Sequence, residues 1–346
     1  MRFFKVGIVA VVVAAIVLLI VLFRPTRREA AFFPMGGIPF KVVAYDRTML
    51  QFDTDMAEVR KRVAELESVF DRFNAGSELS KINKIAAVAP VTVSQDIEQL
   101  VELSRKWNKE SDGAFDPTVV PLEDLWKQAA ESGKLPEEGA VRAARAKTGL
   151  DKVSQAGNLR IFFAREGMGL DFGAIAKGLI ADSVAKVLTS RGVARGVVDA
   201  GGNALAFGEG SFLFGIQDPT AAKRGVLIGT VDVRAGAVIT SGNYERYVEI
   251  GGKRYSHIID PHTGRPVDNG LLSATVIGGN GADADALATA LMVLGREKGI
   301  ALIKRLENVK AVLIEETPHG PEVWASASLG QNLKLDGEWS KRLHQF

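Results

Sequence analysis

The chain has 346 residues, of which 47% are hydrophobic and 24% are charged, with 36 glycines, 12 prolines and no cysteine. These fractions are typical of globular proteins and exclude a largely disordered or collagen-like chain. The lack of cysteine excludes disulfides, thiolate metal sites and a cysteine nucleophile. Because the chain has only four histidines, a metal ion would be bound mainly by oxygen ligands.

The first 28 residues form a separate segment. Two basic residues precede an uninterrupted apolar run from Val6 to Phe23, and three arginines follow it. At about 1.5 Å per residue, a helix over this run is just long enough to cross a bilayer core. We therefore predict one N-terminal transmembrane helix as an uncleaved anchor over residues 1–28, with a signal peptide as the alternative. A linker over residues 29–39 then leads to one folded unit over residues 40–346.

The charge of the remaining chain argues against nucleic-acid binding. Residues 1–28 carry five of the 43 Lys and Arg residues and none of the 41 Asp and Glu residues, so the remainder has a net charge of −3. It contains no basic tract of the kind that binds nucleic acid. Basic residues on the two sides of the apolar run nearly balance, so they leave the orientation of the anchor open.

The first part of the folded unit reads as one strand followed by helices. Residues 40–45 are strand-like, and apolar residues recur at spacings of three and four from Met56 to Phe73. This spacing predicts an amphipathic helix with Thr54 as its N-cap. A second helix is predicted after Ser94, ending near Gly113.

From residue 159 onward, short strand-like runs predominate. Gly251 and Gly252 are typical of a hairpin turn between two of these runs. Helical patterns interrupt the series at about 175–190, 283–294 and 297–306. Strands and helices in this irregular order predict an α+β architecture rather than a doubly wound sheet.

A glycine-bearing turn leads into the predicted helix at residue 175. It runs from Asp171 to Gly178 and contains Lys177. Free N–H groups at a helix start, together with a lysine, suit an anionic phosphate group. The alternative is a plain strand-to-helix turn with a surface lysine, and the stretch matches neither of the common nucleotide-binding motifs.

Two further polar turns are weaker candidates. Gly201 and Gly202 end a strand-like run and permit a positive φ or the close approach of a ligand. Thr240 and Ser241 begin a turn whose hydroxyl groups can bind a ligand. Each turn is also compatible with a purely structural role.

A histidine near the end of a strand-like run is the candidate general base. In a strand over residues 255–259, His257 and Ile259 would share one face. A histidine beside a loop can accept a proton near neutral pH. The alternative is a structural histidine that is bonded to the backbone.

An alanine-rich helix start offers oxygen ligands for a metal ion. Asp285 and Thr289 are four residues apart, so their oxygens project from one helix face. A carboxylate, a hydroxyl and a backbone carbonyl form a reasonable site for Mg²⁺. The neighbouring Asp283 can instead be read as a helix N-cap.

Taken in order, these segments resemble the ApbE family of FAD:protein FMN transferases. The resemblance extends over about residues 70–306 and implies a T-fold-like arrangement of mixed sheets with packed helices. Seven segments carry it: 77–83 (SELSKIN), 113–119 (GAFDPTV), 171–178 (DFGAIAKG), 201–202 (GG), 240–242 (TSG), 257–261 (HIIDP) and 284–291 (ADALATAL).

The resemblance implies an enzyme that binds FAD and Mg²⁺ and transfers FMN to a Thr or Ser hydroxyl of a partner flavoprotein, with release of AMP. It implies that Asp285 and Thr289 bind the metal through side chains and Ala176 through its backbone oxygen. His257 would activate or position the acceptor hydroxyl and border the flavin site. The other residues implied to line the FAD pocket are Asp116, Asp171, Lys177, Gly201, Gly202, Thr240 and Ser241.

The resemblance also implies a location and a partner. The enzyme would sit at the bacterial inner membrane and face the periplasm, near membrane-associated acceptor subunits with a Ser/Thr-Gly-Ala-Thr motif. Two alternatives remain: an FAD pyrophosphatase that uses water as the acceptor and gives FMN and AMP, and a non-catalytic FAD-binding protein. Covalent labelling of an acceptor distinguishes the transferase from both.

Overall fold

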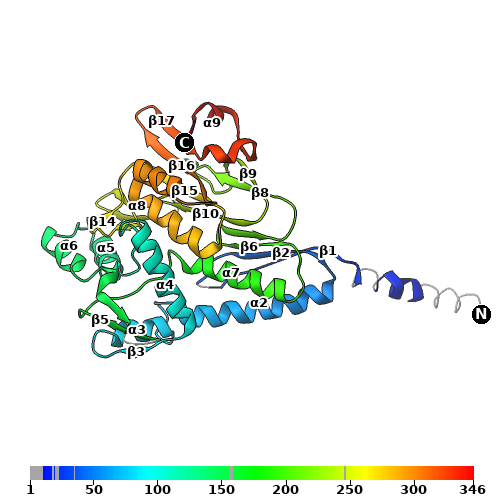
Figure 1. Ribbon diagram of the computed structural model, residues 1–346, viewed down its shortest axis with the longest axis horizontal. Helices are drawn as coiled ribbons and strands as arrows, with labels where there is room; N and C mark the ends of the chain where they lie inside the picture. The colour runs from blue at the N-terminus through cyan, green and yellow to red at the C-terminus, as the bar shows by residue number, and fades with distance from the viewer. Residues whose placement is uncertain (1–10, 18, 20–22, 35, 156–158, 245–246) are drawn as a thin grey trace, which may run out of the picture.

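The computed structural model describes residues 11–17, 19, 23–34, 36–155, 159–244 and 247–346. A nine-stranded sheet forms its centre (Figure 1). Its neighbouring strands are antiparallel except the last pair, which is parallel. The strand order is β1 (Thr26–Phe32), β2 (Phe40–Arg47), β6 (Gly196–Ala200), β7 (Asn203–Phe207), β10 (Gly236–Gly242), β15 (Leu271–Ile277), β16 (Lys310–Thr317), β17 (Gly320–Ala325) and β19 (Leu343–Gln345).

The two faces of this sheet are covered by different layers, because alternate residues of a strand point to opposite sides. On β10, Ala237 and Ile239 belong to the core cluster beneath the helices, whereas Val238 belongs to a second cluster. That second cluster contains Ile228 and Val231 of a three-stranded sheet, which covers the other face. The strands of this smaller sheet are β18 (Leu333–Leu335), β9 (Leu227–Val233) and β8 (Phe212–Gln217).

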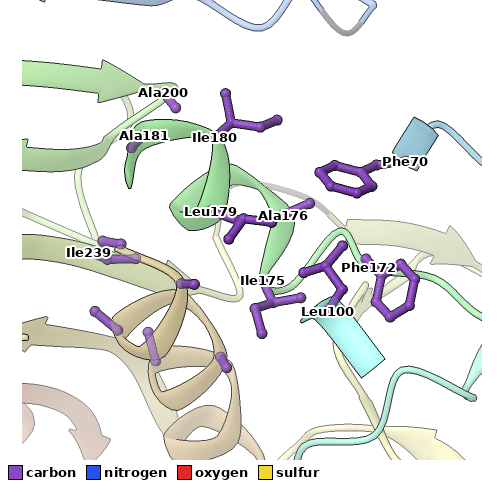
Figure 2. Close-up of a cluster of buried hydrophobic side chains, with 14 of the residues drawn as sticks. Phe70, Leu100, Phe172, Ile175, Ala176, Leu179, Ile180, Ala181, Ala200 and Ile239 are labelled. Carbon is purple, nitrogen blue, oxygen red and sulfur yellow. The ribbon is translucent and has the colours of Figure 1, made fainter. Parts of the chain in front are cut away.

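Four helices cover the first face. α7 (Ala176–Ser190) contacts β6 and β7, and α8 (Gly281–Arg305) contacts β10 and β15. α2 (Met49–Phe70) packs against α7, and α4 (Gln95–Glu110) packs against α8. Figure 2 shows the resulting core, in which the start of α7 lies among side chains from α2, α4 and the sheet.

Smaller elements surround one end of the helical layer (Figure 1). α5 (Val120–Ser132) packs on the hairpin formed by β11 (Tyr247–Ile250) and β12 (Lys253–Ser256), through a separate cluster that contains Leu122, Trp126 and Ile250. The other elements in this region are α3 (Glu78–Ile85), β3 (Val91–Thr92), α6 (Glu138–Arg145), η1 (Leu150–Lys152), β4 (Val153–Gln155), β5 (Arg160–Phe163), β13 (Ile259–Asp260) and β14 (Arg265–Pro266). Two further elements, η2 (Ala327–Asn332) and α9 (Gly337–Lys341), instead contact the three-stranded sheet.

The predicted α+β architecture is confirmed, but the predicted start of the first helix and the predicted boundaries near the N-terminus need correction. Helix α2 begins after Thr48 rather than Thr54, because Thr48 and Gln51 form a capping box. The Gln51 N–H donates to Thr48 Oγ1 at 3.3 Å, and the Thr48 N–H donates to Gln51 Oε1 at 3.1 Å. Residues 26–28, assigned to the anchor, and residues 29–32, assigned to a linker, instead belong to strand β1 because their backbone pairs with the edge of β2.

Half of the anchor predicted for residues 1–28 falls outside the described residues. Within it, residues 11–17, 19 and 23 are described as helical and exposed. Among the residues that the structure describes, no helix is both long enough and apolar enough to span a membrane.

Candidate active site

Helices α7 and α8 begin side by side, because each has a glycine where they meet. A Cβ atom added to Gly178 would lie 2.0 Å from the backbone oxygen of Gly281, and one added to Gly281 would lie 2.4 Å from that of Gly178. Asp182 of α7 accepts hydrogen bonds from the N–H groups of Gly281 (2.7 Å) and Ala282 (2.9 Å). Burial raises the pKa of Asp182, and these two hydrogen bonds oppose the rise. The N-termini of the two helices are thereby fixed relative to each other.

Asp285 lies in the second turn of α8, with only 1% of its surface exposed. Its Oδ2 accepts a hydrogen bond from the Gly178 N–H at 3.0 Å, and its Oδ1 accepts one from Asn203 Nδ2 at 2.7 Å. Lys177 Nζ lies 3.5 Å from the same Oδ1. A buried carboxylate is stable only with partners of this kind. Donors from α7 and β7 therefore fix the position of this side chain.

Thr289 lies one turn after Asp285 on the same helix face, as the spacing predicted. Its Oγ1 lies 3.3 Å from Ser241 Oγ on β10. The adjacent Thr240 makes its contact with Thr275 of β15, with 2.8 Å between their hydroxyl oxygens. Neighbouring residues of a strand point to opposite faces, so Ser241 faces the helical layer and the side chain of Thr240 faces the other side.

These residues fit a cation that prefers oxygen ligands. Among the described residues, no group of three or more His, Asp or Glu side chains could hold a metal ion. A cation here would instead be bound by the Asp285 carboxylate, the Thr289 hydroxyl and the backbone oxygen of Ala176, the first residue of α7. A carbonyl oxygen has two lone pairs, so it can serve both its helix and a cation. This donor set is suited to Mg²⁺.

The close approach of α7 and α8 predicts a large effect of Gly178→Ala. We expect a loss of about 3 kcal/mol or more in the free energy of unfolding, because the new methyl group would overlap the backbone of α8. Denaturant unfolding measures this loss. Gly139→Ala on α6 is the matched control, since nothing lies within 4 Å of its added Cβ and alanine favours a helix. Equal stability of Gly178→Ala and the wild type would contradict the close packing.

A second polar cluster lies before α7, where Arg72 contacts three acidic side chains. Arg72 Nε donates to Asp171 in a short contact, Nη2 donates to Glu123 Oε2 at 3.0 Å, and Nη1 donates to Asp124 Oδ1 at 3.4 Å. The other carboxylate oxygen of Asp171 accepts the Gly173 N–H at 2.6 Å. Asp171, predicted to line the FAD pocket, thus also holds the turn that leads into α7.

The Arg72 cluster predicts a pH-dependent stability. Burial, together with the negative charge of Asp171, raises the pKa of Glu123 to about 8, although Arg72 opposes the rise. The pKa of an unfolded glutamate is near 4.5, so between these values the folded chain binds more protons than the unfolded chain. Stability therefore falls as the pH rises through this range.

We expect Glu123→Gln to reduce that fall in stability. Urea unfolding of the wild type and the variant at about pH 5 and about pH 8.5 measures it. Glu131→Gln, at an exposed position on the same helix, is the control and should retain the wild-type dependence. An unchanged pH dependence in Glu123→Gln would show that Glu123 is not the group responsible.

Asp116 shapes the turn before α5. Its Oδ1 accepts hydrogen bonds from the N–H (2.8 Å) and the hydroxyl (2.6 Å) of Thr118. Burial raises the pKa of Asp116, and the bonds from Thr118 oppose the rise. This carboxylate thus holds the local turn, and it also accepts a backbone hydrogen bond from Leu150.

Gly201 and Gly202 form the two-residue turn of the β6–β7 hairpin. Their φ values of 68° and 94° lie in the region that favours glycine. Ala200 and Asn203 face each other across the hairpin. The glycine pair therefore brings Asn203 directly to the start of β7, where it meets Asp285.

His257 lies at a bend rather than within a strand. β12 ends at Ser256 and β13 begins at Ile259, so the predicted continuous strand over 255–259 is wrong. The Ser256 hydroxyl accepts the Ile258 N–H at 3.1 Å, and this bond supports the bend. Ser256 and Ile258 are buried, whereas His257 is exposed. His257 is therefore a surface residue at the bend between β12 and β13.

The structure brings part of the predicted site together. The contacts above join Lys177, Asp285, Thr289 and Ser241 into one group, which we call the α7–α8 site, while Asp171 belongs to the Arg72 cluster. Two cavities, of about 620 Å³ and 460 Å³, are lined by other parts of the chain, and none of the predicted site residues lines either one.

Asn203 and Arg72 are the polar partners that the sequence did not single out. Asn203 lies 82 positions before Asp285, and Arg72 lies 99 positions before Asp171. A sequence signal exists only for Asn203, which directly follows the glycine pair. No sequence signal indicates that Arg72 binds Asp171, and this contact is found only in the folded structure.

The chain is thus an α+β protein. Its α7–α8 site gathers carboxylate and hydroxyl oxygens where the N-termini of two helices meet. The chain belongs to the ApbE family, whose pattern it matches over residues 37–313. It is 36% identical over 259 residues to the FAD:protein FMN transferase of Klebsiella pneumoniae (strain 342), covering 75% of this chain and 81% of that protein. It is 34% identical over 279 residues to the protein of the same name from Treponema pallidum (strain Nichols), covering 75% and 76%.

Solved structures of ApbE proteins are also similar to this chain. The flavin transferase ApbE from Vibrio cholerae superposes with a TM-score of 0.77 at 28% identity, over 88% of this chain and 98% of that one. The apo form of the Pseudomonas stutzeri flavinyl transferase ApbE superposes with a TM-score of 0.76 at 28% identity, over 90% and 98%.

Proposed function

We propose that this chain is an FAD:protein FMN transferase, which transfers FMN from FAD to a Thr or Ser hydroxyl of a partner flavoprotein and releases AMP. The names of its relatives and its membership of the ApbE family support this activity. The observation that carries the proposal is Asp285, a buried carboxylate fixed at the N-termini of α7 and α8 and one turn from Thr289. A structural protein would have no need to bury such a group beside Lys177.

The reaction is a phosphoryl transfer between two oxygens. The acceptor hydroxyl oxygen bonds to the phosphorus of the FMN half, and the bond from that phosphorus to the oxygen shared with AMP breaks. AMP leaves with the bonding electron pair, and the hydroxyl proton passes to a base. We assign this base to His257, because this residue is exposed at the bend between β12 and β13, where another protein can present a hydroxyl group.

Binding of the anionic FAD requires positive charge and free donors. We propose Lys177 and the turn before α7 for the phosphates, with Gly201, Gly202 and Ser241 nearby. Asp116, Asp171 and Thr240 complete the proposed pocket. Asp116 and Asp171 hold turns in it. Thr240 would contribute through the backbone of β10, because its side chain faces the other side of the sheet. Mg²⁺, bound by Asp285, Thr289 and Ala176, would stabilise negative charge on the phosphate oxygens.

We also propose that residues 1–28 hold the enzyme at the bacterial inner membrane with the catalytic domain in the periplasm. The apolar run from Val6 to Phe23 supports this placement. Strand β1 begins at Thr26, so the folded domain starts directly after the run. An enzyme held in this way would meet membrane-associated acceptor subunits.

The test is covalent flavinylation of an acceptor domain that carries the Ser/Thr-Gly-Ala-Thr motif. The chain is mixed with FAD, Mg²⁺ and this domain, and the denatured acceptor is examined for flavin fluorescence in a gel. We expect a fluorescent band that requires Mg²⁺ and is absent when both hydroxyl residues of the motif are replaced by alanine. Free FMN and AMP without a labelled acceptor would indicate a pyrophosphatase, and intact FAD would indicate a binding protein.

A further inference from the structure

Asn203 makes the shortest of the three contacts that hold the Asp285 carboxylate. Its Nδ2 lies 2.7 Å from Asp285 Oδ1, against 3.0 Å for the Gly178 N–H and 3.5 Å for Lys177 Nζ. Asn203 is 3% exposed and Asp285 is 1% exposed, so water competes little for this bond. A hydrogen bond from a buried amide to a buried carboxylate fixes the orientation of both groups.

The Asp285 carboxylate has few lone-pair positions left with which to bind a cation. A carboxylate offers about four lone-pair positions, and here Asn203 and Lys177 occupy Oδ1 while the Gly178 N–H occupies one position on Oδ2. Among the described residues, no further donor fills the second position on Oδ2. Asn203 orients the carboxylate without adding a positive charge, whereas a lysine or arginine in its place would repel a cation.

From these contacts we infer that Asn203 is a positioning residue for cation binding at Asp285. The inference rests on the proposed function and deepens it, because it assigns a role to the glycine pair before Asn203. The Gly201–Gly202 turn sets the β6–β7 register with Ala200 opposite Asn203, and this register places the amide against Asp285. Asn203 thus acts through Asp285 rather than on FAD.

Mn²⁺ binding to the full chain tests this inference, with free Mn²⁺ measured by electron paramagnetic resonance. We expect Asn203→Ala to raise the Kd for Mn²⁺ by about 10-fold to 100-fold, as loss of a residue that orients a metal ligand does. Asn269→Ala is the matched control. Asn269 Nδ2 donates to the Met292 oxygen at 2.9 Å, so its loss should lower the melting temperature and leave the Kd unchanged.

Asn203→Asp keeps the inference testable if Asn203→Ala does not fold. It has the same shape but places a second carboxylate beside Asp285. We expect a lower melting temperature without divalent cations and a larger increase on adding Mn²⁺ than in the wild type. The lack of an extra increase would show that the side chain at position 203 does not act on cation binding at Asp285.

The outcomes separate this inference from the proposed function. A wild-type Kd in Asn203→Ala, or an ordinary response to Mn²⁺ in Asn203→Asp, would overturn the role of Asn203 while flavin transfer stands. If Asp285→Ala binds Mn²⁺ as the wild type does, the cation is bound elsewhere and the role of Asn203 fails with the metal assignment. Absence of flavin transfer in the wild type, with Mn²⁺ binding intact, would overturn only the proposed function.

Discussion

Asp285→Ala should reduce Mg²⁺-dependent FMN transfer by about 1,000-fold or more, which corresponds to about 4 kcal/mol in the activation free energy. Asp285 supplies the negative charge of the proposed cation site, and the other two ligands, from Thr289 and Ala176, are neutral oxygens. Without it, the positive charge of Lys177 would also face the cation without compensation. Initial rates of acceptor labelling at several Mg²⁺ concentrations measure the effect.

Asp283→Ala is the matched control for this variant. Asp283 lies two residues earlier on α8, where its carboxylate accepts hydrogen bonds from Trp107 (2.6 Å), Lys106 (2.9 Å) and Asn280 (2.9 Å). Its loss should lower the melting temperature, because these contacts support the start of α8, but it should leave Mg²⁺-dependent turnover in place. Full activity of Asp285→Ala would overturn the metal assignment.

His257→Ala should slow FMN transfer by about 100-fold to 10,000-fold while leaving FAD binding nearly unchanged. The reason is its exposed position at the bend between β12 and β13, where it can meet the acceptor hydroxyl. Transfer rates at saturating FAD, together with the Kd for FAD measured by fluorescence, separate the two effects.

His262→Ala is the control for His257→Ala. His262 lies five residues later, with Nε2 2.8 Å from the Asp112 oxygen and Nδ1 3.1 Å from Asp260 Oδ1. Its replacement should loosen these loops without removing a proton acceptor for the reaction. Equal losses of transfer and FAD binding in His257→Ala would identify His257 as a binding residue instead.

Local signals in the sequence predicted the elements that depend on near neighbours. Ser94 caps α4 through its hydroxyl, which accepts the Ile97 N–H, and Gly251 and Gly252 turn the β11–β12 hairpin. The start of α2 was misplaced because Thr48 and Thr54 are both good N-caps. The capping box with Gln51 decides between them.

Strand β1 could not be predicted from its own residues. Its sequence, TRREAAF, shows neither a strong apolar alternation nor a turn signal. It becomes a strand because the edge of β2 offers unpaired backbone groups, and that edge exists only in the folded sheet.

Part of the candidate site was predictable because it depends only on the spacing of residues within one helix or one strand. Asp285 and Thr289 share a face because they are four residues apart, and that relation holds in any helix. The opposite faces of Thr240 and Ser241 follow from strand geometry, but which face meets α8 depends on the packing of the sheet. The Asn203 and Arg72 contacts join distant parts of the chain, and no local pattern determines them.

The measurement that tests the central claim most directly is the intact mass of the acceptor together with the AMP formed in the same reaction. The chain, FAD, Mg²⁺ and the acceptor domain are incubated, and both products are measured over time. We predict a mass increase equal to one FMN attached through a phosphoester, with one AMP released for each labelled acceptor. AMP formation with an unchanged acceptor mass would contradict transfer and show that water is the acceptor.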